Sequence, residues 1–196
     1  LGILPMIQKL FTAEIGYHVS LVPSATPFSR NGIFSGRFLS EIQDQEPEMW
    51  QRIANSESSM NLGEPDMFKN LLRELFGRDF SHAYHKLSIA KEGQRFLTRM
   101  KEYSDLLLIA LVVNFVDLLT HHRAESDVLQ EMIPDESGYR SLVQTWFANS
   151  WLLEVLNTAA EMDFTVILTS DHGSIRVQRG VKIAADRETS KGVRYK

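Results

Sequence analysis

The sequence has no cysteine among its 196 residues. Disulfide bonds and thiolate-ligated metal sites are therefore excluded, and any metal centre would have to use histidine, aspartate and glutamate side chains. A chain without cysteine is compatible with a reducing compartment, and we expect a cytoplasmic protein.

Long apolar runs and an excess of basic charge are also lacking. The longest apolar run, at 106–113, is far shorter than the ~20 residues of a membrane-spanning helix, so we expect no membrane insertion. A formal net charge of −4 argues against extended wrapping of nucleic acid, which needs a basic surface. No glycine-rich phosphate-binding loop is present. The length suits one domain with a sizeable core.

What is present is a set of apolar segments that end in polar, metal-capable residues. The clearest is 164–173, FTVILTSDHG, in which apolar and β-branched residues run directly into Asp171 and His172. We predict a buried strand here, because parallel α/β sheets place ligand sites at the carboxyl ends of their strands. Alone, the Asp-His-Gly triplet is more typical of a turn with a hydrogen-bonded histidine. Two further segments that end in the same way favour a site.

The second such segment is 106–116, which is almost continuously apolar and is typical of a central parallel strand buried on both faces. Asp117 follows it, and His121 lies four residues further on. The two side chains can converge on one cation if the strand passes directly into a helical turn. A helix start with an exposed histidine explains the same residues equally well.

The third segment, 17–22, reads as a strand and leads to Thr26 and Pro27. A threonine before a proline predicts a helix start, with the threonine as N-cap and the helix continuing to about residue 39. Capping is the simpler role for Thr26, but the positive end of a helix dipole also favours bound anions. Arg30 lies one turn further on and either faces the same way or is solvated.

The rest of the sequence predicts mainly helices around the sheet. Residues 40–100 are polar and irregular, with short helices at 49–53 and 67–76, and we interpret them as an insertion or cap over the sheet edge. Within this region we interpret His82 and Lys86 as a solvated face at helical spacing. The apolar and aromatic pattern of 136–162 predicts the longest helix. Residues 174–177 and 181–184 predict a short ribbon.

These elements together predict a doubly wound α/β fold, with a mainly parallel sheet and helices on both faces. Oxygen and imidazole ligands without thiolate favour zinc, with manganese or iron as alternatives. Two such metals can hold the attacking and leaving oxygens of an in-line displacement. Threonine is a poor nucleophile unless a metal or a base activates it.

The stretches SATPFSRNGIFSG, NFVDLLTHH and ILTSDHGSIRV together resemble the PglZ domains of the alkaline phosphatase superfamily. The resemblance covers nearly all of residues 1–196, as a partial PglZ domain. With SLVQTWFANSWL and the terminal RYK, it is greatest to the effector domains of PorX-like response regulators, which act in type IX secretion. It implies an alkaline phosphatase-like fold. It further implies a longer parent chain that supplies a receiver domain, one more aspartate ligand before residue 1 and one more histidine ligand after residue 196.

The resemblance implies a phosphodiesterase with two zinc ions. Thr26 would be the nucleophile and also a metal ligand, and Asp171 and His172 would bind the same ion. Asp117 and His121 would bind the other ion.

Arg30 and Asn31 would hold the phosphoryl oxygens of the substrate, which for such domains includes cyclic and linear oligonucleotides. The same metals would also serve phosphoryl transfer or sulfate ester hydrolysis. A non-catalytic alternative is a signalling scaffold that binds a sigma factor or a receptor tail. The partners implied for the parent protein are a sigma factor or a histidine kinase, together with homodimerisation controlled by phosphorylation.

Overall fold

The computed structural model describes residues 2–22, 24–55, 61–123, 125–174, 179 and 181. The chain divides into two compact units. The first unit comprises Leu1–Gly16 and Ser81–Ile167, and the second comprises Tyr17–Phe80 and Leu168–Lys196. The ribbon predicted at 174–177 and 181–184 falls almost wholly on residues outside this description.

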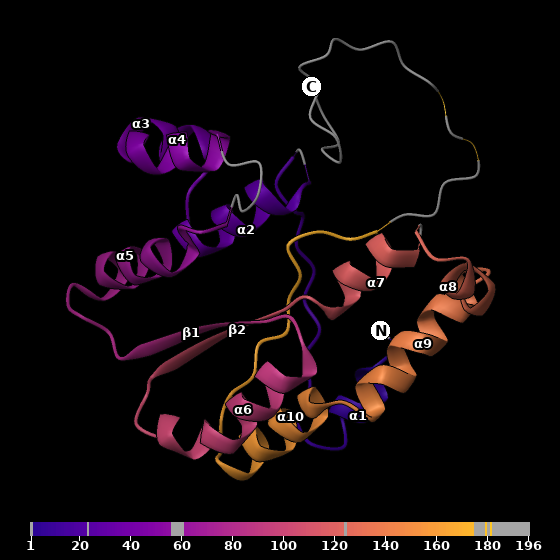
Figure 1. Ribbon diagram of the computed structural model, residues 1–196. Helices are drawn as coiled ribbons and strands as arrows, with labels where there is room; N and C mark the ends of the chain where they lie inside the picture. The colour runs from indigo at the N-terminus through magenta and orange to yellow at the C-terminus, as the bar shows by residue number, and fades with distance from the viewer. Residues whose placement is uncertain are drawn as a thin grey trace. The chain divides into compact units, whose positions relative to one another are not determined.

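The first unit contains a two-stranded parallel sheet (Figure 1). Strand β1 (His82–Leu87) pairs with β2 (Leu108–Val113) in a register that runs from His82↔Leu108 to Leu87↔Val113. The connection between them carries helix α6 (Ala90–Arg99) and the 3₁₀-helix η1 (Met100–Tyr103). Parallel strands need such a crossover, because a tight turn cannot join them.

Strand β1 corrects the prediction of a helically spaced, solvated face at His82 and Lys86. Its sequence, HAYHKL, has neither the clear alternation nor the apolar run that marks a strand. It is a strand because the apolar β2, LIALVV, pairs with it along its whole length. Strand β1 thus lies within 40–100, and the interpretation of that region as an insertion or cap stays a prediction.

Helix α10 (Trp151–Glu161) packs against α6 and completes the core of the first unit. A Cβ atom at Gly93 of α6 would lie 2.0 Å from the Trp151 ring, so the glycine permits this close packing. The buried members of this core are Leu87, Phe96, Met100, Trp151, Val155 and Ala159. A second cluster, built on Ile7, Phe147 and Leu156, joins helix α1 (Leu4–Ile7) to the same unit.

The single long helix predicted at 136–162 is wrong, because the structure has two helices there. Helix α9 (Glu136–Ala148) ends and α10 begins across Asn149 and Ser150. Asn149 Nδ2 donates to the carbonyl of Thr145 at 2.8 Å, and Ser150 Oγ donates to the carbonyl of Phe147 at 3.0 Å. Short polar side chains that bond to nearby carbonyls compete with the helical ladder, which accounts for the break. Helices α7 (Phe115–Arg123) and α8 (Asp127–Met132) precede α9.

The second unit is helical where it is described. Helices α2 (Thr26–Ser35) and α5 (Glu64–Phe76) pack together, with Phe34 and Phe68 edge to face at 5.6 Å between ring centroids. Helix α3 (Leu39–Gln45) and helix α4 (Pro47–Asn55) pack through Ile42 and Met49, which form one apolar cluster with Met67 of α5. The helices predicted at 49–53 and 67–76 are confirmed within α4 and α5.

Two predicted strands do not form among the described residues. The segments 17–22 and 164–170 have no helical or strand assignment, and Tyr17 and Ile167 are 94% and 84% exposed. A β-branched run becomes a strand only where a neighbour completes its hydrogen-bond ladder. The doubly wound sheet with helices on both faces is thus corrected to a mostly helical α/β arrangement with a small parallel sheet.

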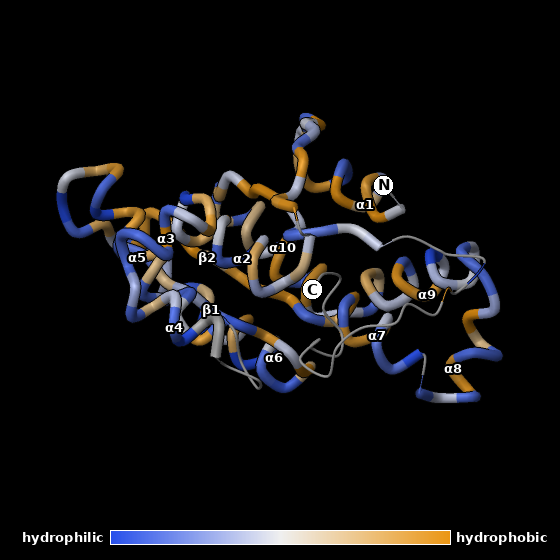
Figure 2. Tube along the Cα trace, turned by 90° about the horizontal axis from the view of Figure 1, so that it is seen from above, coloured by the Kyte–Doolittle hydropathy of each residue, from blue (hydrophilic) through white to orange (hydrophobic). Residues whose placement is uncertain are grey.

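Hydrophilic and hydrophobic residues alternate along most of the helices (Figure 2), as expected when one face of a helix packs on a core. Within the described part of the chain, no helix combines the length and the hydropathy that crossing a bilayer requires.

Candidate active site

Thr26 is the first residue of α2, and its side chain contacts His172. The N-cap of α2 is Ala25, which makes no side-chain capping bond, so the prediction that Thr26 is the N-cap is wrong by one position. Instead, Thr26 Oγ1 lies 2.8 Å from His172 Nε2. Both residues belong to the second unit, although they are 146 positions apart in the sequence.

The second ring nitrogen of His172 determines the direction of this hydrogen bond. His172 Nδ1 lies 3.1 Å from the carbonyl oxygen of Gly173, which can only accept. Nδ1 therefore carries the proton, and in the neutral ring Nε2 carries the lone pair. It follows that the Thr26 hydroxyl donates to Nε2. The same lone pair is the one that a metal ion would use.

Asp171 supplies a second metal-capable donor beside His172. Its Oδ2 lies 3.5 Å from His172 Nε2, and the two side chains are only 22% and 17% exposed. Two ligands of a tetrahedral zinc ion, each ~2.0–2.2 Å from the metal, are about 3.3–3.5 Å apart. The spacing and chemistry of this pair thus fit two ligands of one ion, with the Thr26 oxygen as a third donor.

Asp117 and His121 form a comparable pair in the first unit. Both lie on α7, and Asp117 Oδ1 is 3.4 Å from His121 Nε2. The strand β2 does pass into this helix after one residue, as the convergence of the two side chains requires. Their side chains are 48% and 70% exposed, which equally suits an exposed ion pair at a helix start. Their role as metal ligands stays a prediction.

Neither pair makes a complete metal site by itself. Among the described residues, no group of three histidine, aspartate or glutamate side chains is placed to hold one ion. A catalytic zinc site commonly has three protein ligands. Each pair would therefore need further donors.

Arg30 and Asn31, predicted to hold phosphoryl oxygens, are buried within the second unit. Arg30 pairs with Glu64, the first residue of α5, and the side chains are 9% and 0% exposed. Asn31 Nδ2 donates to the carbonyl of Pro27. Their substrate-binding role stays a prediction. Glu64 was not predicted, because a glutamate before Pro65 at a helix start carries no sign of a partner on α2.

Ser20 is another residue that carried no signal in the sequence. Its hydroxyl donates to the main-chain carbonyl of Asp171 and lies 3.0 Å from Ser29 Oγ on α2. Close by in the sequence, His18 Nε2 lies 3.3 Å from the carbonyl oxygen of Ser170. The segment before α2 is thereby hydrogen-bonded to the segment that carries Asp171 and His172.

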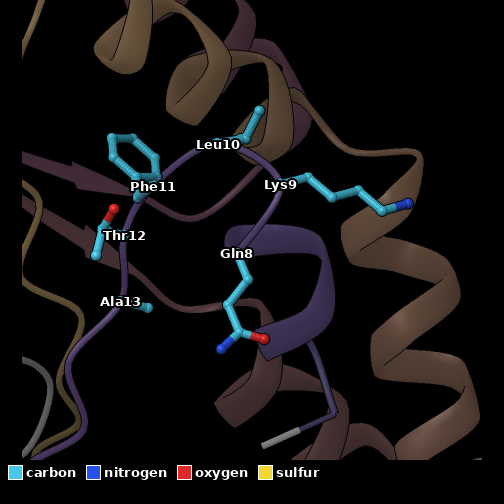
Figure 3. A pocket seen from close by; sticks show the side chains of 6 residues that line it. All are labelled: Gln8, Lys9, Leu10, Phe11, Thr12 and Ala13. Atoms are coloured by element: carbon cyan, nitrogen blue, oxygen red, sulfur yellow. The ribbon is translucent and has the colours of Figure 1, made fainter.

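A shallow hollow in the first unit is lined by other residues. Its wall consists of Gln8, Lys9, Leu10, Phe11, Thr12 and Ala13, which follow α1 (Figure 3). Leu10 and Phe11 also pack against the second apolar cluster of this unit. None of the predicted site residues lines this hollow.

Comparison with known proteins identifies the family. No curated protein matches the chain. A family model described as the BREX system PglZ alkaline phosphatase-like domain matches residues 3–194, a range that contains all of the predicted site residues. The chain therefore belongs to the PglZ family of alkaline phosphatase-like domains.

Proposed function

We propose that this domain is a zinc-dependent phosphodiesterase in which Thr26 is the nucleophile. The observation that carries the proposal is the 2.8 Å contact between Thr26 Oγ1 and His172 Nε2, with Asp171 beside it, in a chain of an alkaline phosphatase-like family. The ion that His172 and Asp171 would hold lies within reach of the Thr26 hydroxyl, and coordination of that hydroxyl is what would activate it as a nucleophile.

The reaction begins with attack of Thr26 Oγ1 on the phosphorus of a phosphodiester. The Oγ1–P bond forms while the P–O bond to the leaving alcohol breaks. The proton released from Oγ1 ends on the leaving alkoxide, which departs as the alcohol, so the step balances. Water then attacks the phosphothreonine, the P–Oγ1 bond breaks, and a phosphomonoester is released as Oγ1 regains its proton.

The metal donors are assigned as two separate pairs. Asp171 and His172, together with Thr26, would hold one zinc ion, and Asp117 and His121 would hold the other, with manganese or iron as alternatives. A bound zinc ion would supply Lewis-acid stabilisation of negative charge on oxygen. By engaging Nδ1 with the carbonyl of Gly173, the chain leaves the lone pair of His172 Nε2 for the ion, 2.8 Å from the Thr26 oxygen that would bind the same ion.

The substrates that we infer are cyclic or linear oligonucleotides. The resemblance of SLVQTWFANSWL and RYK to PorX-like effector domains is the ground on which we propose a parent protein that is a cytoplasmic response regulator of type IX secretion. The description of the matched family names the BREX system, which is the alternative setting for the same chemistry. The roles that we propose for Thr26, Asp171 and His172 are the same in a type IX secretion regulator and in a BREX system.

The test is hydrolysis of bis-p-nitrophenyl phosphate by the zinc-loaded chain. We expect Thr26→Ala to lower kcat by at least about a hundredfold, since no other group forms the covalent intermediate. Thr98→Ala is the matched control, because Thr98 is an exposed threonine whose hydroxyl bonds only within α6, to the carbonyls of Gln94 and Arg95. Hydrolysis that is unaffected by Thr26→Ala would refute the covalent role. Partner binding that survives Asp171→Ala and chelation, without any hydrolysis, would favour the scaffold.

A further inference from the structure

We propose that Ser20 is a positioning residue, which ties helix α2 to the main chain of Asp171 and so keeps Thr26 Oγ1 within reach of His172 Nε2. The inference rests on the proposed function for its catalytic consequence. The contact itself lies wholly within the second unit and can be tested without turnover.

The hydrogen bonds of Ser20 have a defined direction. A main-chain carbonyl can only accept, so the single hydroxyl proton of Ser20 goes to Asp171 O. Ser29 must then donate its own proton to Ser20 Oγ, at 3.0 Å. The result is an ordered chain from Ser29 through Ser20 to the carbonyl of Asp171, in which each bond polarises the next.

The position of Ser29 makes this chain relevant to Thr26. Ser29 lies three residues after Thr26 on α2, which is one helical turn, and its side chain is buried at 2% exposure. A helix moves as a rigid body over one turn, so a shift of Ser29 relative to Asp171 also shifts Thr26 Oγ1. His172 follows Asp171 directly, so the hydrogen bonds from Ser29 through Ser20 to Asp171 link the two partners of the 2.8 Å contact, Thr26 and His172.

Two further contacts hold the same segment in place. Leu21 packs so closely on α2 that a Cβ atom at Gly32 would lie 2.3 Å from its Cδ1 atom. His18 Nε2 lies 3.3 Å from the carbonyl of Ser170, which precedes Asp171. Ser20 thus lies between Leu21, which contacts α2, and His18, which contacts the segment that carries Asp171 and His172.

The test compares Ser20→Ala with Ser20→Thr, Ser29→Ala and the control Ser40→Ala, which changes an exposed serine of α3. The first readout is amide hydrogen exchange of Phe28 and Ser29 in the metal-free chain, because both N–H groups donate to the carbonyl of Ala25 at 2.9 Å in the first turn of α2, which Ser20 ties down. We expect exchange there to be about tenfold faster in Ser20→Ala and Ser29→Ala, because the ordered chain is broken in both. Ser40→Ala should behave as the unchanged protein, and Ser20→Thr should restore protection because it keeps the hydroxyl.

The second readout is catalysis by the zinc-loaded chain. We expect Ser20→Ala to lower kcat about 10- to 100-fold with little change in KM, since small displacements of reacting groups cost rate rather than binding. If the unchanged protein hydrolyses no phosphodiester, the proposed function fails while the exchange measurement still decides the role of Ser20. Exchange that is unchanged in both Ser20→Ala and Ser29→Ala would overturn the proposal. If Ser20→Ala does not fold, the exchange rates of Ser29→Ala and Ser20→Thr test the proposal: faster exchange in Ser29→Ala with normal exchange in Ser20→Thr supports it, and unchanged exchange in Ser29→Ala overturns it.

Discussion

The buried ion pair between Arg30 and Glu64 gives a quantitative prediction for the second unit. The pair joins α2 to α5, and its side chains are 9% and 0% exposed. Glu64→Ala removes the carboxylate while the guanidinium stays buried. Breaking a buried pair by removing one partner typically costs about 3–5 kcal/mol. Because domains of this size are stable by only about 5–15 kcal/mol, that loss is a large fraction of the total.

The assay is urea unfolding of the full chain, and a surface pair supplies the control. Arg73 and Asp79 form an ion pair 3.0 Å apart whose side chains are 54% and 80% exposed. Asp79→Ala should therefore cost less than about 1 kcal/mol. Replacing Arg30 and Glu64 together by methionine should recover most of the loss, since apolar groups of similar size need no partner. The reasoning is refuted if Glu64→Ala costs no more than Asp79→Ala.

Two further predictions concern the first unit. His85 packs against Phe96, and burial together with the nearby Arg99 guanidinium lowers the pKa of its imidazole below 6.5. The folded protein therefore favours the neutral imidazole, and stability that is present above about pH 6.5 is lost as the pH falls below that value. His85→Phe should reduce the dependence of the urea unfolding midpoint on pH, measured between pH 5 and 8. Gly93→Ala should destabilise the chain by about 1–3 kcal/mol, because the added methyl meets the Trp151 ring at 2.0 Å. The ~1 kcal/mol gained in helix propensity offsets only part of the packing cost over most of that range, and a higher melting temperature in Gly93→Ala would contradict the packing argument.

The local sequence pattern was sufficient to predict an element where its own residues, rather than distant partners, favour that structure. The apolar run at 106–116 predicted a strand, and β2 forms over Leu108–Val113 of it, but β2 is partly exposed rather than a central strand buried on both faces. The spacing of Asp117 and His121 predicted two side chains on one helical face, as α7 shows. Thr26 was placed within one residue of its position at the start of α2. The break at Ser150 was missed, because the apolar periodicity continues across it.

Long-range pairing could not be predicted in the same way. Strand β1 has no strand pattern of its own and depends on β2, whereas the β-branched run at 165–169 has the pattern but lacks a ladder among the described residues. Ser20 and Glu64 belong to residue types that are common on surfaces, and only their distant partners make them important. The proximity of Thr26 and His172 was expected from the family resemblance and from the sheet-edge argument, rather than from spacing.

The most direct test of the account is to identify the residue that carries the covalent intermediate. The zinc-loaded chain would be mixed with bis-p-nitrophenyl phosphate, quenched in acid within the first turnover, digested and examined by mass spectrometry. We predict a phosphoryl adduct on the peptide that contains Thr26, and its loss in Thr26→Ala together with turnover. Turnover that continues in Thr26→Ala, or an adduct on a different residue, would contradict the assignment of Thr26 as the nucleophile.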